Sequence, residues 1–250
     1  MKTHVIVVLD KSSSMQSCFN ATLNDYNELV SMCQDRSKEK DHQITCSLVT
    51  FNHDVTEHFW QSPVEDLKPA TEQDYVCSGC TALNDAVGWA YSKALEGMVP
   101  NLEDKDAILI HILTDGMENS SIKFHGKDGL AKTKEMAKEL EKTKQVTITF
   151  VGTDRRAVEQ SAVNFGVSVG SCAVMDTSNE NMAQNGYDHR ASGTRCYFAA
   201  RSQGRNVVNN FMGQEGIADF TNSADAEEKE EDKNVYTNNN PWNKKKVRRA

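Results

Sequence analysis

The feature that most constrains the fold is a short apolar run that ends in a carboxylate. Val5–Leu9 is rich in β-branched side chains and is followed directly by Asp10. A run this short and continuous is typical of a parallel strand that is buried on both faces. Ser12 and Ser14 follow Asp10 at intervals of two, so in an extended loop the three side chains point the same way. Carboxylate and hydroxyl oxygens are hard ligands of the kind that a small divalent cation prefers.

Two later segments place similar oxygens at similar positions. Thr81 stands at the mouth of an apolar-periodic helix that we expect over about 82–96. A second buried run, Ile108–Leu113, leads into Thr114 and Asp115. In open parallel sheets, ligands bind at the carboxyl ends of the strands, near the point where the strand order reverses. Asp10 and Asp115 are both expected at such ends.

Along the chain the apolar pattern alternates between strands and helices, which favours a parallel sheet covered on both faces. The segments 42–52 and 55–61 are expected to be antiparallel, with a tight turn between them. Asp128 and Asp154 are expected helix caps, Gly166 a left-handed helix stop and Thr177–Glu180 a capping box. The expected strands are 3–10, 42–52, 55–61, 107–114, 146–153 and 172–175, and the expected helices are 19–34, 82–96, 128–143, 154–166 and 179–202.

The three oxygen-bearing segments together resemble the von Willebrand factor type A (vWA) domain and its metal-ion-dependent adhesion site. The pattern is a strand with Asp10-x-Ser12-x-Ser14, then Thr81 before a helix, then a strand with Thr114-Asp115-Gly116. The first motif alone occurs by chance in many chains, but all three in order on the expected elements are specific. The resemblance implies an α/β fold with a doubly wound, mostly parallel six-stranded sheet, one antiparallel edge strand and helices on both faces.

The resemblance also implies a metal site that binds Mg²⁺, with Mn²⁺ as the alternative ion. Its residues would be Asp10, Ser12, Ser14, Thr81 and Asp115. In the family the serines bind directly, the aspartates act mainly through bound waters, and the threonine moves between direct and water-mediated contact. A dication with mostly neutral ligands keeps positive charge and an open coordination position, so it should attract a carboxylate from a partner protein. The competing interpretation is that Ser12 and Ser14 only cap the first helix.

Neighbouring polar residues are given structural roles. We expect Thr114 to be a hydrogen-bonding residue at a strand end and Asp85 to support a helix dipole without binding metal. Glu118 and Asn119 follow Asp115 and could border the site, but a solvated turn is the preferred interpretation. His111 lies within a buried run and is expected to be a core histidine.

Composition indicates the domain organisation of the chain and its location in the cell. We expect a vWA domain over 1–176, a helical C-terminal extension over 177–220, and a disordered acidic and then basic tail over 221–250. The apolar start is too short for a signal peptide, no segment is long enough to cross a bilayer, and the seven cysteines are mostly scattered. These features predict a cytoplasmic protein with no membrane partner and with reduced thiols.

The expected function is Mg²⁺-dependent capture of a protein partner that presents Asp or Glu. The domain layout is similar to that of intracellular single-domain members from bacteria and phages, which implies an AAA+ ATPase or an assembly component as the partner. Three alternatives stay open: a redox role for Cys77 and Cys80, a metal-dependent hydrolase-like enzyme, and weak nucleic-acid binding by the basic run 244–249. The net charge of −8 argues against general nucleic-acid binding. Against catalysis, position 12 is a serine where a phosphatase of this general shape would need a second aspartate.

Overall fold

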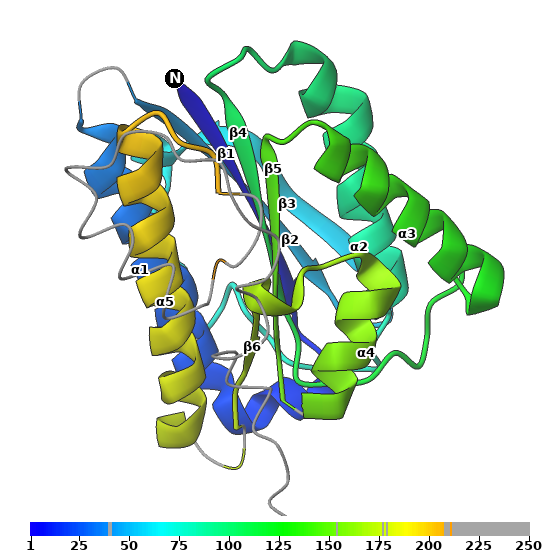
Figure 1. Cartoon of the computed structure of the whole chain (residues 1–250). Helices are drawn as coiled ribbons and strands as arrows, with labels where there is room; N and C mark the ends of the chain where they lie inside the picture. The colour runs from blue at the N-terminus through cyan, green and yellow to red at the C-terminus, as the bar shows by residue number, and fades with distance from the viewer. Residues whose placement is uncertain (40–41, 154, 177, 179, 208–210, 212–250) are drawn as a thin grey trace, which may run out of the picture.

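A computed structural model describes residues 1–39, 42–153, 155–176, 178, 180–207 and 211. Its centre is one six-stranded sheet with the strand order β3-β2-β1-β4-β5-β6 (Figure 1). All neighbouring strands pair in parallel except β2 and β3, which are antiparallel. The strands are β1 Lys2–Asp10, β2 Gln43–Phe51, β3 Val55–Pro63, β4 Ala107–Leu113, β5 Val146–Gly152 and β6 Cys172–Val174.

Helices cover both faces of this sheet. In Figure 1, α1 and α5 lie on one face, and α2, α3 and α4 lie on the other. Two apolar clusters fill the layers, because successive residues of β1 point to opposite faces: Val5 and Val7 join the first cluster, and Ile6 and Val8 the second. The helices are α1 Phe19–Ser37, α2 Leu83–Lys93, α3 Gly126–Lys142, α4 Arg155–Phe165 and α5 Glu180–Ser202. The predicted fold class is confirmed.

The strand order reverses at β1. The chain moves outward from β1 to β2 and β3, and then returns to place β4 on the other side of β1. In open α/β sheets, ligands bind beyond the carboxyl ends of the strands at such a reversal. Here the loops that follow Asp10 and Leu113 stand at that position.

Local boundaries differ from the expected ones in a few places. Asp128 does not cap α3, because the residue before that helix is His125 and Asp128 lies in its first turn. Gly166 ends α4 with a φ of +68°, the left-handed conformation expected there. The expected cap Asp154 lies outside the described residues, as do Thr177 and Asn179 of the expected capping box.

α5 packs against α1 and contributes to the first apolar cluster, so it is more than a helix laid on the surface. Ala191, Thr194 and Phe198 are all buried, whereas Ala199 is half-buried. The buried Arg190 of α5 forms an ion pair with the buried Asp25 of α1, with 2.5 Å between Nη2 and Oδ1. On the outside of the same two helices, Arg195 and Glu28 form an exposed pair at 3.0 Å.

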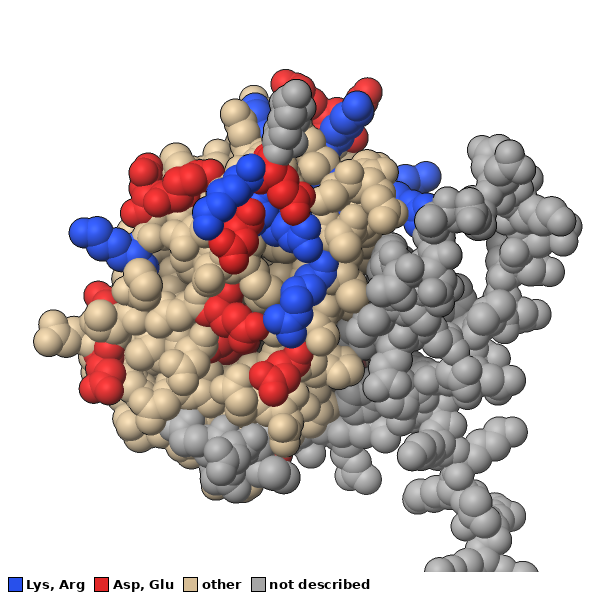
Figure 2. Space-filling model, turned by 90° about the vertical axis from the view of Figure 1, so that its left-hand side faces the viewer, with Lys and Arg blue, Asp and Glu red and all other residues tan. Residues whose placement is uncertain are grey.

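The outer surface of the α1 and α5 layer mixes charges of both signs. Figure 2 shows Lys and Arg side chains interspersed with Asp and Glu on this face. A nucleic-acid-binding face would carry clustered positive charge. The basic run 244–249, on which the nucleic-acid alternative depends, lies outside the described residues. No helix in the described part of the chain is long and apolar enough to span a membrane.

His42 is a buried histidine on the α5 side of the sheet. It is 4 % exposed, and its Nε2 lies 2.9 Å from Thr3 Oγ1. Its Nδ1 has no hydrogen-bond partner among the described residues. Burial, helped by the positive charge of Arg201, lowers the pKa of His42 to about 4, so the ring stays neutral in the folded protein well into the acidic range.

Acidification should therefore destabilise the protein through His42. Between the ordinary pKa of 6.5 and about pH 4, the unfolded chain carries a proton on His42 that the folded protein does not bind. Between pH 8 and pH 5, the free energy of unfolding should fall by about 2 kcal/mol more in the unmodified protein than in a His42→Gln variant. Urea unfolding of both proteins at the two pH values measures this difference, and parallel pH profiles would contradict it.

Candidate metal site

Asp10 is the buried centre of the candidate site. It is the last residue of β1 and is fully buried. Its Oδ1 accepts a hydrogen bond from the backbone N–H of Ser12 at 2.7 Å, and its Oδ2 accepts one from the hydroxyl of Thr114 at 2.5 Å. The phenol of Tyr75 donates to the Asp10 carbonyl oxygen at 2.5 Å. The carboxylate is thus fixed between the ends of β1 and β4.

Ser12 and Ser14 lie beside one another and reach across to the second strand end. Their Oγ atoms are 3.2 Å apart, and Ser14 Oγ donates to Asp115 Oδ1 at 2.6 Å. Ser12 stands at the N-cap of a short 3₁₀ helix, Ser13–Cys18, but its side chain makes no capping hydrogen bond. The capping interpretation is therefore wrong for Ser12, and the observed side-chain partner of Ser14 is a carboxylate.

Thr81 brings the third segment to the same point. A Cβ atom built on Gly116 would lie 3.1 Å from Thr81 Oγ1 and 3.5 Å from Ser14 Oγ, so both hydroxyls border one small space beside Asp115. Thr81 is held there by its backbone N–H, which donates to Asn119 Oδ1 at 2.8 Å. The structure therefore brings together all five residues that the sequence predicted.

Electrostatics make this space attractive to a cation. Burial raises the pKa of Asp10 to about 6, although Thr114 and Ser12 donate hydrogen bonds that oppose the rise, and the charge of Asp115 raises it further. Burial also raises the pKa of Asp115, against the hydrogen bond from Ser14. Two poorly solvated carboxylates beside three hydroxyls form a donor set of hard oxygens that suits a small divalent ion. The residues present therefore fit the metal that the sequence predicted.

The loops are pinned by polar residues whose role the sequence did not reveal. Glu118 accepts hydrogen bonds from the backbone N–H groups of Ser120, Ser121 and Asn84 at 2.9, 2.7 and 2.8 Å. Asn119 holds Thr81 from both sides, because its own backbone N–H donates to the Thr81 carbonyl oxygen at 3.0 Å. Asn119 is exposed, as in a solvated turn, but both residues also bond the segment that carries Thr81 and Asn84. Their bonds join two loops that are far apart in sequence.

Thr114 has the hydrogen-bonding role at a strand end that was expected, and Asp85 stands in the first turn of α2 but also has a role that the sequence did not predict. Asp85 accepts backbone hydrogen bonds from Ile122, Lys123 and Phe124 at 2.8, 3.2 and 2.7 Å, which anchors the loop before α3. Thr114 bonds Asp10 through its hydroxyl and also accepts the backbone N–H of Gly116 at 3.1 Å. These hydrogen bonds explain the positions of both residues without any contact to a metal.

The remaining candidate residues lie in different surroundings. Cys77 and Cys80 are free thiols, half-buried and exposed respectively, and burial raises the pKa of Cys77. This shift disfavours a reactive thiolate at Cys77. His111 is fully buried in β4, with Nδ1 2.6 Å from Thr149 Oγ1, and is the expected core histidine.

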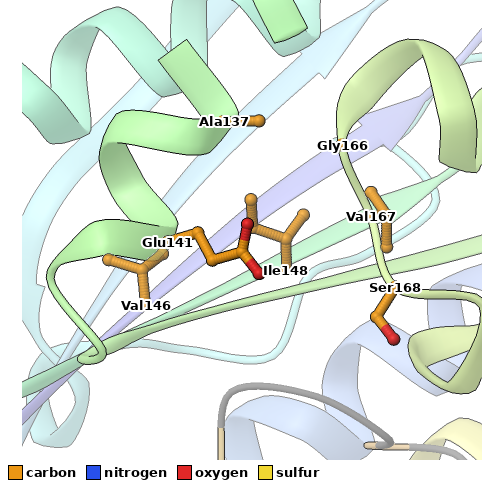
Figure 3. Close-up of a pocket in the computed structure, with 7 residues that line it drawn as sticks. All are labelled: Ala137, Glu141, Val146, Ile148, Gly166, Val167 and Ser168. Atoms are coloured by element: carbon orange, nitrogen blue, oxygen red, sulfur yellow. The ribbon is translucent and has the colours of Figure 1, made fainter. Parts of the chain in front are cut away.

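The site is not the pocket drawn in Figure 3. That pocket lies between α3, the start of β5 and the segment after α4, with Glu141 and Ser168 among its lining residues (Figure 3). Val146, another lining residue, opens β5, so the pocket lies at the amino end of the sheet and away from Asp10 and Asp115. Among the described residues there is no cluster of three or more His, Cys, Asp or Glu side chains that could hold a metal. The candidate site has two carboxylates, Asp10 and Asp115, and its other three members are hydroxyls.

Gly116 is the residue that keeps the space beside Asp115 open. Gly116→Ala would insert a methyl group 3.1 Å from Thr81 Oγ1, closer than an ordinary contact. We expect Mg²⁺ affinity to fall about tenfold, as it does when residues around a metal site are disturbed, with little change in stability. Gly97→Ala, whose Cβ would meet nothing within 4 Å, is the matched control. Calorimetric Mg²⁺ titration of both variants measures the effect, and equal affinities would show that the space is not used.

The chain folds as a doubly wound α/β domain with a hydroxyl and carboxylate cluster at its strand reversal. The model of the von Willebrand factor type A domain matches residues 4–187. The chain therefore belongs to the vWA domain family, a family of protein-interaction modules. The match ends within α5, and the division of the chain at residue 176 stays a prediction.

Solved structures of similar shape include proximal thread matrix protein 1 from the mussel byssus. One crystal form is 16 % identical, with a TM-score of 0.46 over 75 % of this chain and 44 % of that chain. A further structure of the same protein, described with a zinc-occupied metal-ion-dependent adhesion site motif, is 18 % identical, with a TM-score of 0.42 over 68 % of this chain and 40 % of that chain. This chain thus spans less than half the length of that protein. No curated protein matches the sequence.

Proposed function

We propose that this vWA domain is a Mg²⁺-dependent interaction module that captures an acidic side chain of a partner protein. Asp10, Ser12, Ser14, Thr81 and Asp115 would hold the ion. When bound, the ion would supply a Lewis-acidic position for the partner's carboxylate. The observation that carries the proposal is the convergence of three hydroxyls and two carboxylates from three segments.

The balance of charge supports capture of an anion. The serine hydroxyls would be direct, neutral ligands, whereas the two aspartates would act mainly through bound waters, as the family resemblance implies. Asp10 is fully buried, with both carboxylate oxygens already accepting hydrogen bonds. A site that leaves much of the ion's charge uncompensated favours an additional negative ligand. Ser14 is exposed and Asp115 is half-buried, so the open side of the site faces solvent. A partner's carboxylate could approach from there.

We propose binding and not catalysis. Asp10 is occupied by the Ser12 and Thr114 donors, and Asp115 by Ser14, so the carboxylates are arranged to position hydroxyls. A hydrolase would need a free base aimed at a water or substrate atom. The histidine on the neighbouring strand, His111, is buried in the core and cannot provide one.

For the partner we propose an AAA+ ATPase or an assembly component, as the resemblance to intracellular bacterial and phage members implies. We propose a cytoplasmic location as well. All seven cysteines are free thiols in the structure, which suits a reducing compartment.

Selection from a random displayed peptide library tests the proposal without knowledge of the partner. The immobilised protein should enrich peptides that contain Asp or Glu when Mg²⁺ is present, and the enrichment should disappear in chelator. Ser14→Ala should lose both Mg²⁺ binding and the acidic enrichment, with a loss in Mg²⁺ affinity of at least about tenfold. Ser13→Ala is the matched control, since Ser13 is the neighbouring residue in the same short 3₁₀ helix and has an exposed side chain.

Two outcomes decide the proposal. Acidic enrichment that survives in chelator or in Ser14→Ala would overturn it. Mn²⁺ should replace Mg²⁺ in the selection, because both ions favour oxygen ligands. Direct titration of Mg²⁺ into the two serine variants then separates loss of metal binding from loss of peptide capture.

A further inference from the structure

We infer that the metal site is the centre of a larger docking surface, and that its partner segment carries an apolar side chain close to the captured carboxylate. This inference rests on the proposed function and specifies the partner's chemistry. The juxtaposition that carries it is an apolar rim, defined as Val76, Met117 and Ile122, on the loops that build the site. These side chains are 60 %, 76 % and 82 % exposed.

The rim residues lie on segments that are hydrogen-bonded to the site or to the loops beside it. Large hydrophobic residues that remain exposed in the described part of the chain are few: the three rim residues, Val163 and Val169. Val76 lies between Tyr75, which bonds the Asp10 carbonyl oxygen, and the loop that leads to Thr81. Exposed apolar groups that gather around a functional site mark interaction surfaces, whereas scattered ones need no explanation.

Met117 is exposed on a fixed backbone. It follows Gly116, whose backbone N–H donates to Thr114 Oγ1 at 3.1 Å. It precedes Glu118, whose carboxylate accepts three backbone N–H groups. The apolar side chain is therefore held towards solvent by a loop that is bonded on both sides of it. A preorganised apolar contact of this kind lowers the entropy cost of binding, and methionine adapts to varied partner shapes.

Ile122 extends the rim and is followed by a positively charged side chain. Its backbone N–H is anchored on Asp85 at 2.8 Å, so the loop position is fixed while the side chain stays exposed. Lys123 follows, is exposed, and has no ion-pair partner within the described residues. An acidic segment with apolar neighbours fits a surface that offers a cation site, apolar side chains and a free ammonium group. A second copy of this chain is the competing occupant.

The peptide selection described above distinguishes these possibilities when the residues next to the acidic position are read. With Mg²⁺, peptides should be enriched in a Leu, Ile, Met or Phe within three residues of the Asp or Glu. A Met117→Ser/Ile122→Ser variant should keep the acidic enrichment but lose the apolar preference. For a selected peptide it should weaken binding about tenfold, which corresponds to about 1.4 kcal/mol. Val163→Ser, at an exposed valine on α4, should behave like the unmodified protein.

Each result has one meaning for the inference. Acidic enrichment without an apolar preference would overturn the apolar rim and leave the proposed function standing. The absence of any Mg²⁺-dependent acidic enrichment would overturn both. Concentration-dependent self-association in sedimentation, lost in Met117→Ser/Ile122→Ser, would assign the rim to a second copy of the chain and so overturn the peptide-segment partner.

Discussion

Replacing Arg190 with methionine should lower the free energy of unfolding by about 3–5 kcal/mol, because it leaves the buried Asp25 carboxylate without its counter-charge. Arg190 is fully buried, and its Nε and Nη2 groups both donate to the Asp25 side chain, at distances between 2.5 and 3.1 Å. Burial raises the pKa of Asp25 to about 6 even beside the guanidinium, which shows how costly this carboxylate is to bury. Urea unfolding measures the loss.

The exposed pair between the same helices is the matched control. Arg195 and Glu28 are 3.0 Å apart, with side chains 54 % and 40 % exposed, so Arg195→Met should cost less than about 1 kcal/mol. The double variant Asp25→Leu/Arg190→Met should recover most of the lost stability, since both buried charges are then absent. Arg190→Met within about 1 kcal/mol of the unmodified protein would contradict the expectation.

This ion pair shows where sequence patterns fail. Ala191, Thr194 and Phe198 are buried at helical spacing on α5, a pattern of the kind that periodicity can reveal. Arg190 lies next to that stripe, and hydrophobic periodicity treats an arginine as exposed. Arg190 can be buried because its guanidinium bonds Asp25, which lies 165 positions earlier in the chain.

The strands and the site residues were predictable for a different reason. The apolar runs before Asp10 and Asp115 give strong local signals, and parallel strands place their carboxyl ends together whatever the loops do. The pinning residues could not be found in this way. Glu118 and Asn119 act on Asn84 and Thr81 across two loops, and no local pattern records such a pairing. The sequence places a helix cap at Asp128, whereas α3 begins at Gly126 after His125, because the start of a helix depends on the geometry of the loop before it.

Asp115→Asn should weaken metal binding without lowering the stability of the metal-free protein. Asparagine keeps an oxygen that can accept the hydrogen bond which Ser14 donates to Asp115 at 2.6 Å. The substitution removes a half-buried negative charge that raises the pKa of Asp10, so in chelator the free energy of unfolding should stay the same or rise. In Mg²⁺ the variant should lose the stabilisation that a bound ion gives, about 2.7 kcal/mol at a concentration one hundred times the dissociation constant.

The effects with and without Mg²⁺ together identify the role of the Asp115 carboxylate. A residue kept for stability loses stability when it is changed, whereas a residue kept for function at a strained site often does not. Asp176→Asn is the control, because Asp176 also follows a strand but is exposed and bonds only Ser178 among the described partners. Its response to Mg²⁺ in a urea titration should match that of the unmodified protein. An undiminished Mg²⁺ effect in Asp115→Asn would show that the ion, if it binds, is held without this carboxylate, and the convergence of β1 and β4 on one cation would then have to be abandoned.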